Sequence, residues 1–262
     1  MAATDPVASW WLKVERAHKH FADVKAIIRS TVPNERLSSV RVEKDYREDE
    51  WVYSLHLDID LPTELALAIG DFLFNMASAL DHITTANAGG VGGNHTNFPI
   101  FPVDIRHDGP YESKAHSRWH DRWEKTRNAV DPAVFAVIEE AQPFMYTVKG
   151  TAENMQHPLA LLNNLHNADK HERLNVIAHG LSDLVAVIDG IVVNDVITPG
   201  TMIKDGAAFL THPREVDVEL TGTVVLAILG GLVVDHYVIP QALNHIDHWV
   251  PSLLRRIEAV MP

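Results

Sequence analysis

The longest apolar segment of the chain, residues 62–87, predicts one long helix. Its apolar side chains point in almost every direction around the helix axis: Leu65, Leu67, Ile69, Phe72, Leu73, Phe74, Met76, Leu80 and Ile83. Four polar residues recur at i, i+4, i+7 and i+11 and therefore share one face: Asp71, Asn75, Ser78 and His82. Because a helix that is apolar on most sides is buried, we expect this polar stripe to find partners inside the protein.

A second helical pattern, residues 158–177, repeats this arrangement. Leucines supply its core positions, and a polar stripe recurs at i, i+3, i+7 and i+11: Asn164, Asn167, His171 and Asn175. The same segment contains a dense polar run: Asp169-Lys170-His171-Glu172-Arg173. If the two stripes face each other in the helical core, one pocket gathers eight side chains: Asp71, Asn75, Asp81, His82, Asn164, Asp169, Lys170 and His171.

The beginning of the chain predicts a helix and a hairpin. Thr4 or Asp5 can cap a helix that opens at Pro6 and continues to about residue 31. Residues 39–46 and 51–59 then alternate apolar and polar positions, which is typical of two strands. They flank a charged turn: Arg47-Glu48-Asp49-Glu50.

The middle of the chain predicts two shorter helices. On residues 110–127, His116 and His120 have the spacing of two metal ligands. However, basic side chains crowd this segment, so a solvated face is the better interpretation: Lys114, Arg118, Arg122 and Lys125. Residues 133–141 predict a short helix that is stopped by a proline.

From residue 180 onward, short β-branched runs alternate with turn signals. These signals are Asp189-Gly190, Asp205-Gly206, Thr221-Gly222 and Gly230-Gly231. We expect strands near residues 184–188, 191–194, 201–203, 208–210, 215–220, 223–229 and 232–238. Part of this antiparallel meander is expected to pair with the early hairpin. Pro240 then opens a closing helix that bends or restarts at Pro251.

The chain contains neither a Pro/Ser-rich linker nor an internal repeat, so we expect one α+β domain over residues 1–262. Its fold class is a helical bundle core with an early β-hairpin, followed by a C-terminal antiparallel β meander and a closing helix. The mainly helical part covers residues 1–178, the β-rich part residues 179–238, and the closing helix residues 240–261.

Charge and composition exclude several classes of function. The 22 basic and 35 acidic residues give a net charge of −13, which disfavours binding to duplex DNA. The absence of cysteine excludes disulfides and thiolate chemistry. We also expect no membrane span and no secretory signal, and therefore a cytoplasmic location. The 16 histidines make acid–base or metal chemistry worth considering.

Several stretches together resemble a widespread family of uncharacterised bacterial proteins. The main ones are Gly70-Asp71 through Leu80-Asp81-His82, Phe98-Pro99-Ile100, and Asn167-Ala168-Asp169-Lys170-His171. Two shorter stretches also look like that family: Arg16-Ala17 with His20, and Gln142-Pro143. The resemblance covers roughly residues 8–178 and is specific as a combination of motifs.

Typical members of that family have an arginine before the Ser-x-Leu-Asp-His segment. The resulting Arg-x4-His spacing is similar to that of HEPN domains, helical modules that often cleave RNA through a metal-independent arginine and histidine. Here Ala77 occupies the arginine position, and Glu172 is inserted before Arg173. The resemblance therefore implies a HEPN-like nucleotide- or RNA-binding protein with a degenerate RNase motif, working as a homodimer.

In the catalytic interpretation, His82 and His171 act as general acid and base, while Asp81 and Asp169 orient them. In an RNase-like version of this reaction, Lys170 or Arg173 would stabilise the phosphorane. Further ligand contacts would come from Asp71, Asn75, Asn164, Asn167 and Arg173. Side chains at adjacent positions diverge by about 100° on a helix, which makes a metal on the Asp81–His82 pair awkward. We therefore expect neither a metal nor another cofactor.

Two alternatives remain open. The same polar groups can form a buried, fully paired network without a cleft, in a non-catalytic structural or protein-interaction domain. A weaker alternative is a small-molecule hydrolase that uses the same histidines and aspartates.

Overall fold

The computed structural model describes residues 8–32, 38–45, 48–57, 59–89, 97–106, 114–146, 157–171, 174–193, 202–229 and 237–262. Its elements in chain order are α1 (Ser9–Thr31), β1 (Ser38–Asp45), β2 (Glu50–Leu57), α2 (Thr63–Asn87), α3 (Lys114–Ala129), α4 (Pro132–Glu140), η1 (Pro143–Met145), α6 (Pro158–His171), β3 (Asn175–Ile188), β4 (Ile191–Val193), β5 (Ile203–Lys204), β6 (Ala208–His212), β7 (Val218–Leu229), β8 (Tyr237–Val238) and α7 (Ile239–Glu258). This is the expected α+β arrangement.

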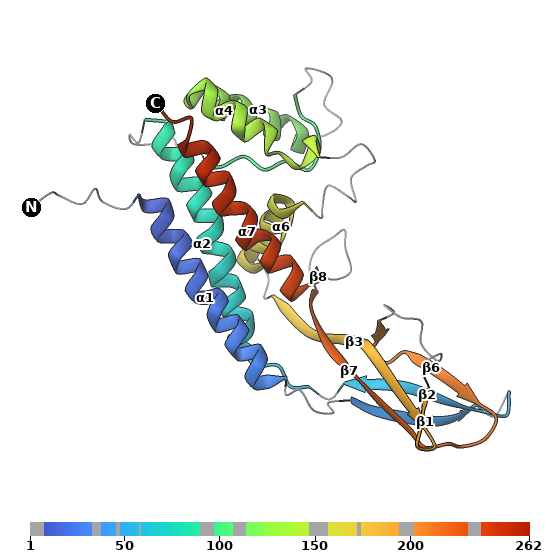
Figure 1. The fold of residues 1–262 in the computed structure, drawn as a ribbon. Helices are drawn as coiled ribbons and strands as arrows, with labels where there is room; N and C mark the ends of the chain where they lie inside the picture. Colours follow the sequence, from blue (N-terminus) through green and yellow to red (C-terminus); the bar gives the residue numbers. More distant parts are fainter. Residues whose placement is uncertain are drawn as a thin grey trace, which may run out of the picture.

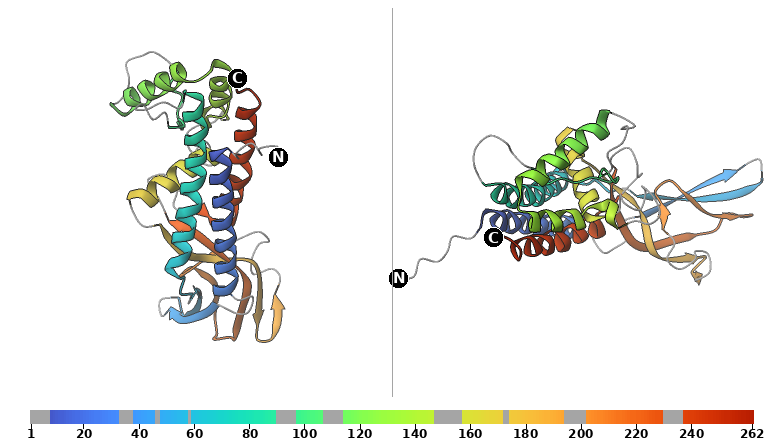
Figure 2. Two further views of the ribbon diagram at one scale, coloured as in Figure 1. Left: turned by 90° about the vertical axis from the view of Figure 1, so that its left-hand side faces the viewer. Right: turned by 90° about the horizontal axis from the view of Figure 1, so that it is seen from above.

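The helices α1, α2 and α7 lie side by side along their lengths, as Figure 1 shows. The short helices α3 and α4 cover one end of this bundle, and the strands lie beyond the other end (Figures 1 and 2). The helix α6 packs against both α2 and α7. As the apolar pattern predicts, α2 is the central helix, and its buried side chains join those of α1, α6 and α7 in one hydrophobic core.

By length and composition, α2 is the one described helix that could also cross a membrane. Length and composition alone do not place it in a membrane, so the expectation of no membrane span stays a prediction. More than half of the apolar window is buried inside the protein, and the core helix of a soluble protein passes the same test. The composition of α2 is accounted for by its central position in the bundle.

The strands form two antiparallel sheets. The first has the order β1-β2-β6, so a strand of the C-terminal meander pairs with the early hairpin, as expected. The second has the order β4-β3-β7-β8, with β5 also paired to β3. Between the sheets lies a small core of Leu55, Leu181, Ala186, Ile203 and Leu220. The predicted turns at Asp189-Gly190 and Asp205-Gly206 are present, and both glycines have positive φ.

The second helical pattern is shorter than expected. The helix α6 ends at His171, and the long strand β3 begins at Asn175 rather than near residue 184. Asn175 therefore does not belong to the polar stripe of α6. The β-branched pair Val176-Ile177 continues the apolar pattern, but it lies in β3, which pairs with β7 along most of its length.

The predicted turn at Thr221-Gly222 was wrong, because β7 runs through it as one strand. A Cβ atom on Gly222 would lie 2.7 Å from the carbonyl oxygen of Ser182. The pairing of β3 with β7 shifts register just beyond Ser182, where this close approach occurs. The glycine thus permits two backbones to approach at a β-bulge.

The helix ends also differ from expectation. The first helix begins at Ser9, and the proposed caps and Pro6 lie outside the described residues. The closing helix α7 continues through Pro251 without restarting. The short helix α4 is capped as its sequence suggests, since Asp131 accepts a hydrogen bond from the Ala133 N–H at 2.8 Å.

Candidate functional site

A cavity of about 540 Å³ opens on the face of α2 that carries the polar stripe. Its walls come from α1, from α2, from α6 and from the segment that follows α2. The lining residues are Ser9, Phe74, Ser78, Asp81, His82, Thr85, Ala86, Asn97, His166 and Lys170. The structure therefore brings together His82, Asp81 and Lys170, three of the residues expected at one pocket.

His82 projects from α2 toward the beginning of α1. Its Nδ1 lies 3.1 Å from the hydroxyl oxygen of Ser9, the first residue of that helix. The two helices run antiparallel, and this is why a residue near the end of α2 meets the start of α1 (Figure 1). A histidine and a serine within hydrogen-bond distance can exchange a proton.

The helix α6 contributes one turn to the cavity through His166 and Lys170, which lie at i and i+4. His166 is only 8% exposed, and its Nδ1 has no hydrogen-bond partner among the described residues. Burial, helped by the positive charge of Lys170, lowers the pKa of His166 to about 4. The imidazole is therefore neutral near pH 7.

Phe74 is an aromatic side chain left partly open at the wall of the cavity. It is 48% exposed, and its ring lies 5.9 Å from the His166 ring, centroid to centroid. The ammonium nitrogen of Lys13 lies 5.5 Å from the Phe74 ring centroid. The wall thus offers aromatic surface next to cations, a combination suited to a flat ring that carries an anionic group.

Asp81 lines the cavity, but its carboxylate is engaged elsewhere. Its Oδ1 accepts a hydrogen bond from the buried Phe98 N–H at 2.8 Å. The Phe98 carbonyl in turn accepts a bond of 2.9 Å from Nη2 of Arg122 on α3. Burial raises the pKa of Asp81, while the Phe98 N–H and the charges of Arg122 and Lys170 oppose that rise. Asp81 therefore anchors the segment that follows α2.

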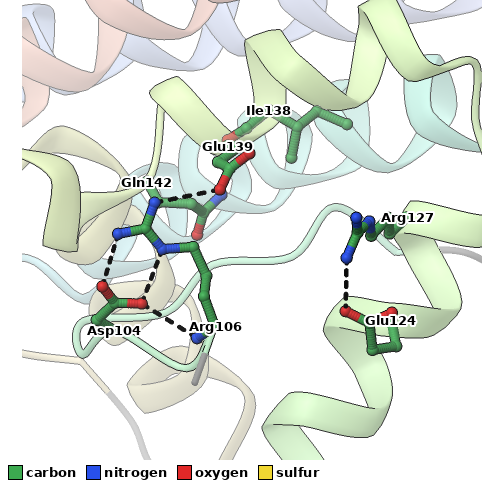
Figure 3. A network of polar contacts seen from close by, with 7 residues as sticks. All are labelled: Asp104, Arg106, Glu124, Arg127, Ile138, Glu139 and Gln142. Carbon is green, nitrogen blue, oxygen red and sulfur yellow. Dashed lines mark hydrogen bonds and ion pairs between the residues drawn. The ribbon is translucent and has the colours of Figure 1, made fainter. Parts of the chain in front are cut away.

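The same segment, residues 97–106, is also held by Glu139 of α4 and by Gln142 in the turn that follows α4. The Gln142 amide donates to the Pro99 carbonyl and accepts from the Phe101 N–H, at 2.9 and 3.1 Å. Further along, Arg106 donates to Asp104 and to Glu139 of α4 (Figure 3). Asp81, Phe98-Pro99 and Gln142-Pro143, which the sequence nominates separately, thus belong to one structural unit.

A second cluster lies nearer the start of α2. A Cβ atom on Gly70 would lie 2.6 Å from Oδ1 of Asp169, so this glycine permits α6 to approach α2 closely. Burial and the neighbouring charge of Asp71 raise the pKa of Asp169. On the other side, Oδ2 of Asp71 lies 3.7 Å from Nδ1 of His20 on α1. Neither Asp71 nor Asp169 lines the cavity around His82.

The remaining predicted site residues are not brought together with His82. Asn75 is buried and donates to the Asp71 carbonyl of its own helix at 2.8 Å. Asn164 is half-buried, Asn167 and His171 are exposed, and none of the three lines the cavity. Arg173 lies outside the described residues. His82 and His171 thus do not form the expected acid–base pair within one cavity.

Metal binding gains no support from these positions. Among the described residues, no group of three or more histidine, aspartate or glutamate side chains is placed to hold a metal ion. The four nominated histidines and aspartates are divided between the cavity (Asp81 and His82), the exposed end of α6 (His171) and the contact with Gly70 (Asp169).

Sequence reasoning missed His166, Phe74 and Ser9 as parts of the cavity. His166 lies four residues before Lys170, so helical spacing from a nominated residue would have found it. Phe74 was assigned to the buried apolar face, although it shares the polar face with Asp71 and Ser78. The position of Ser9 depends on how α1 packs against α2, which no local pattern reveals.

Comparison of the chain with protein-family models, with curated proteins and with solved structures finds no match. The function is therefore inferred from the geometry of the cavity.

Proposed function

We propose that this chain binds a nucleotide or a short stretch of RNA in the cavity beside His82, without cleaving it through an arginine–histidine pair. The observation that carries the proposal is the composition of the cavity wall. A half-exposed aromatic ring, a neutral buried histidine and a lysine converge there in a protein of net charge −13. A base can stack on Phe74, and a phosphate can approach Lys170.

The start of α1 supports the same ligand class. Ser9 begins this helix at the cavity, and no side chain of the described residues forms a capping hydrogen bond there. The first backbone N–H groups and the positive end of the helix dipole favour an anion at this place. His82 stands beside Ser9 and can donate a hydrogen bond to the same anion once protonated.

Binding without cleavage follows from the position of Ala77. This residue replaces the arginine of the HEPN-like spacing, is packed against the hydrophobic core, and does not line the cavity. The charge that would stabilise a phosphorane is thus missing at that position. The proposal includes a homodimer, which the resemblance implies, and a cytoplasmic location, which was expected from the sequence; binding at this cavity requires neither.

The alternative of a purely structural network accounts for part of the site. It explains Asp81 and Asn75, whose polar atoms are bonded to the backbone. It does not explain the cavity or the unpartnered Nδ1 of His166, because that alternative requires paired groups and no cleft.

The proposal is tested by titrating adenosine monophosphate, adenosine and inorganic phosphate into the protein by calorimetry. We expect Lys170→Ala to weaken binding of the monophosphate by roughly tenfold, the order expected for a charge-assisted hydrogen bond. Its affinity for adenosine should not change. Phe74→Ala should weaken the binding of adenosine and leave the binding of inorganic phosphate unchanged. Lys19→Ala, an exposed lysine on α1 outside the cavity wall, is the matched control. Absence of binding by all three probes, or an equal loss in the control, would refute the proposal.

One observation favours a second candidate function, a small-molecule hydrolase. The contact of Ser9 with His82 places a hydroxyl beside a general base. Asp81, the neighbouring carboxylate, is bonded to Phe98 and is not shown orienting His82. Labelling of Ser9 by a fluorophosphonate probe, lost in both Ser9→Ala and His82→Ala, would support this candidate. An unlabelled wild-type protein would exclude an activated serine.

A further inference from the structure

The helix α3 has an unusual charge for this protein. Its 16 residues include five basic and two acidic ones, in a chain that carries an excess of acidic residues overall. Three of its cations, Arg118, Arg122 and Lys125, occupy positions i, i+4 and i+7 and therefore form one stripe. We call these three residues the basic stripe.

The basic stripe lies on the exposed side of the helix, although the Arg122 guanidinium is partly buried where it donates to the Phe98 carbonyl. All three residues are exposed, whereas Trp123 and Thr126 on the inner side of α3 are buried. Neither Arg118 nor Lys125 forms an ion pair with any described residue. By contrast, Arg127 on the opposite flank pairs with Glu124 at 3.4 Å (Figure 3). In an acidic protein, unpaired neighbouring cations repel one another and favour an external polyanion.

The basic stripe begins at the rim of the cavity. Arg122 donates to the Phe98 carbonyl, and the preceding residue, Asn97, lines the cavity. The Phe98 N–H is bonded to Asp81, a further lining residue. Two short contacts thus connect the cavity wall to α3, so the basic stripe begins one residue away from the lining residue Asn97.

We propose that the ligand is an oligonucleotide strand, with one nucleotide in the cavity and the following phosphates on the basic stripe. This inference rests on the proposed nucleotide binding and adds a second contact surface to it. Arg118 and Arg122 are about 6 Å apart along the helix, which is four residues of rise. A single strand can bend to follow such a short row, whereas a duplex would also approach the acidic remainder of the protein.

The test compares a fluorescein-labelled single-stranded RNA dodecamer with adenosine monophosphate. We expect the double variant Arg118→Ala/Lys125→Ala to weaken binding of the dodecamer at least tenfold and to leave the affinity for the monophosphate unchanged. The dependence of log Kd on log salt should flatten by about 1.4, because two phosphate contacts are lost from a single strand. Asp121→Asn, which removes an acidic residue beside the stripe, should tighten dodecamer binding.

The matched control is Lys19→Ala/Lys204→Ala, which removes two exposed cations from α1 and β5. An equal loss in this control would overturn the inference, because net charge would then explain the effect. If the monophosphate binds but the dodecamer binds no more tightly, the inference fails and the proposed function stands. If neither probe binds, the proposed function itself fails.

Discussion

The carboxylate of Asp81 accepts the Phe98 N–H while the same side chain forms part of the cavity wall. A residue in this position has two possible roles, in folding and in ligand binding. Substitution distinguishes the two roles: loss of a contact needed for folding lowers the free energy of unfolding, whereas loss of a contact to the ligand does not. Within the described part of the chain, His82 and Lys170 form no such bond to the backbone of a distant segment, so the two groups of residues should respond differently to substitution.

We predict that Asp81→Ala lowers the free energy of unfolding by about 1–3 kcal/mol, because the buried Phe98 N–H loses its acceptor. Asp81→Asn should lose less stability, since the amide oxygen of asparagine can still accept the hydrogen bond from the Phe98 N–H. Urea denaturation measures both, with Ser78→Ala on the same wall as the control. An unchanged midpoint in Asp81→Ala would show that this carboxylate does not anchor the segment.

The buried histidines predict a pH dependence. Burial lowers the pKa of His157 and of His166 to about 4 in the folded protein, against about 6.5 in the unfolded chain. Between these values the unfolded state binds more protons, so stability falls as the pH falls from 6.5 toward 4. Each histidine contributes at most about 1.4 kcal/mol per pH unit.

Denaturation between pH 7.5 and 4.5 checks this dependence. His166→Gln should flatten the curve, and Gln241→Ala, which changes an exposed residue on α7 that carries no titratable group, should leave its slope intact. Because the raised pKa values of Asp81 and Asp169 act in the opposite direction, the decisive comparison is between variants: equal slopes in the wild-type protein and in His166→Gln would contradict the assignment.

At the scale of elements, helix packing depends on small residues that no amphipathic pattern identifies. Gly70 lies in the middle of the predicted helical segment, where glycine is unfavourable by about 1 kcal/mol relative to alanine. In the structure, the Asp169 carboxylate of α6 fills the space where a Cβ would stand. The presence of glycine at this position is explained only by the close approach of α6 to α2.

We predict a strong coupling between these two residues. Gly70→Ala should be neutral or destabilising in the wild-type protein, because the new methyl group would lie 2.6 Å from Asp169 Oδ1. In an Asp169→Ala background, the same change should stabilise by about 1 kcal/mol through helix propensity. A double-mutant cycle in urea measures the difference, and additive effects would mean that Asp169 moves away at no cost.

The elements themselves were largely predictable from the sequence, but their ends and the site were not. Strong periodicity located α2, and alternation with a charged turn located β1 and β2. Local pattern placed Val176 in a helix because apolar spacing cannot separate a helix end from a buried strand. The cavity depends on the crossing of α1, α2 and α6. Thus Asp81, His82 and Lys170 were found, whereas His166 and Ser9 were not.

On the scale of the whole molecule, the helical and β-rich ends are joined through a continuous apolar interior. Leu226 and Ile228 of β7 belong to the helical core, and Val224 packs against both that core and the core between the sheets. Tyr53 on β2 ties the first sheet to the chain that leads into β7. Its hydroxyl donates to the Val216 carbonyl at 3.0 Å and accepts from the Val216 N–H at 2.7 Å.

We predict that Tyr53→Phe destabilises both ends together. The substitution leaves two buried backbone groups of Val216 without the hydroxyl, a loss of about 1–3 kcal/mol. The melting temperature should fall by about 2–4 °C per kcal/mol, even when the helical circular dichroism signal is followed. His212→Ala, which alters an intermediate-exposure residue on β6, is the control. A helical transition that does not move would show that the two ends unfold independently.

The anchoring of residues 97–106 has a consequence for how such a sequence can diverge. Asp81, Arg122 and Gln142 lie far apart along the chain, yet all three hold the same few backbone groups. If a related sequence lost one of these residues, the segment would be held differently, and the other two residues would be under different selection. Substitutions at the three positions should therefore occur together. In an alignment of homologous sequences, substitutions at these three positions should be statistically linked, while those at Lys170 should instead follow changes in the ligand.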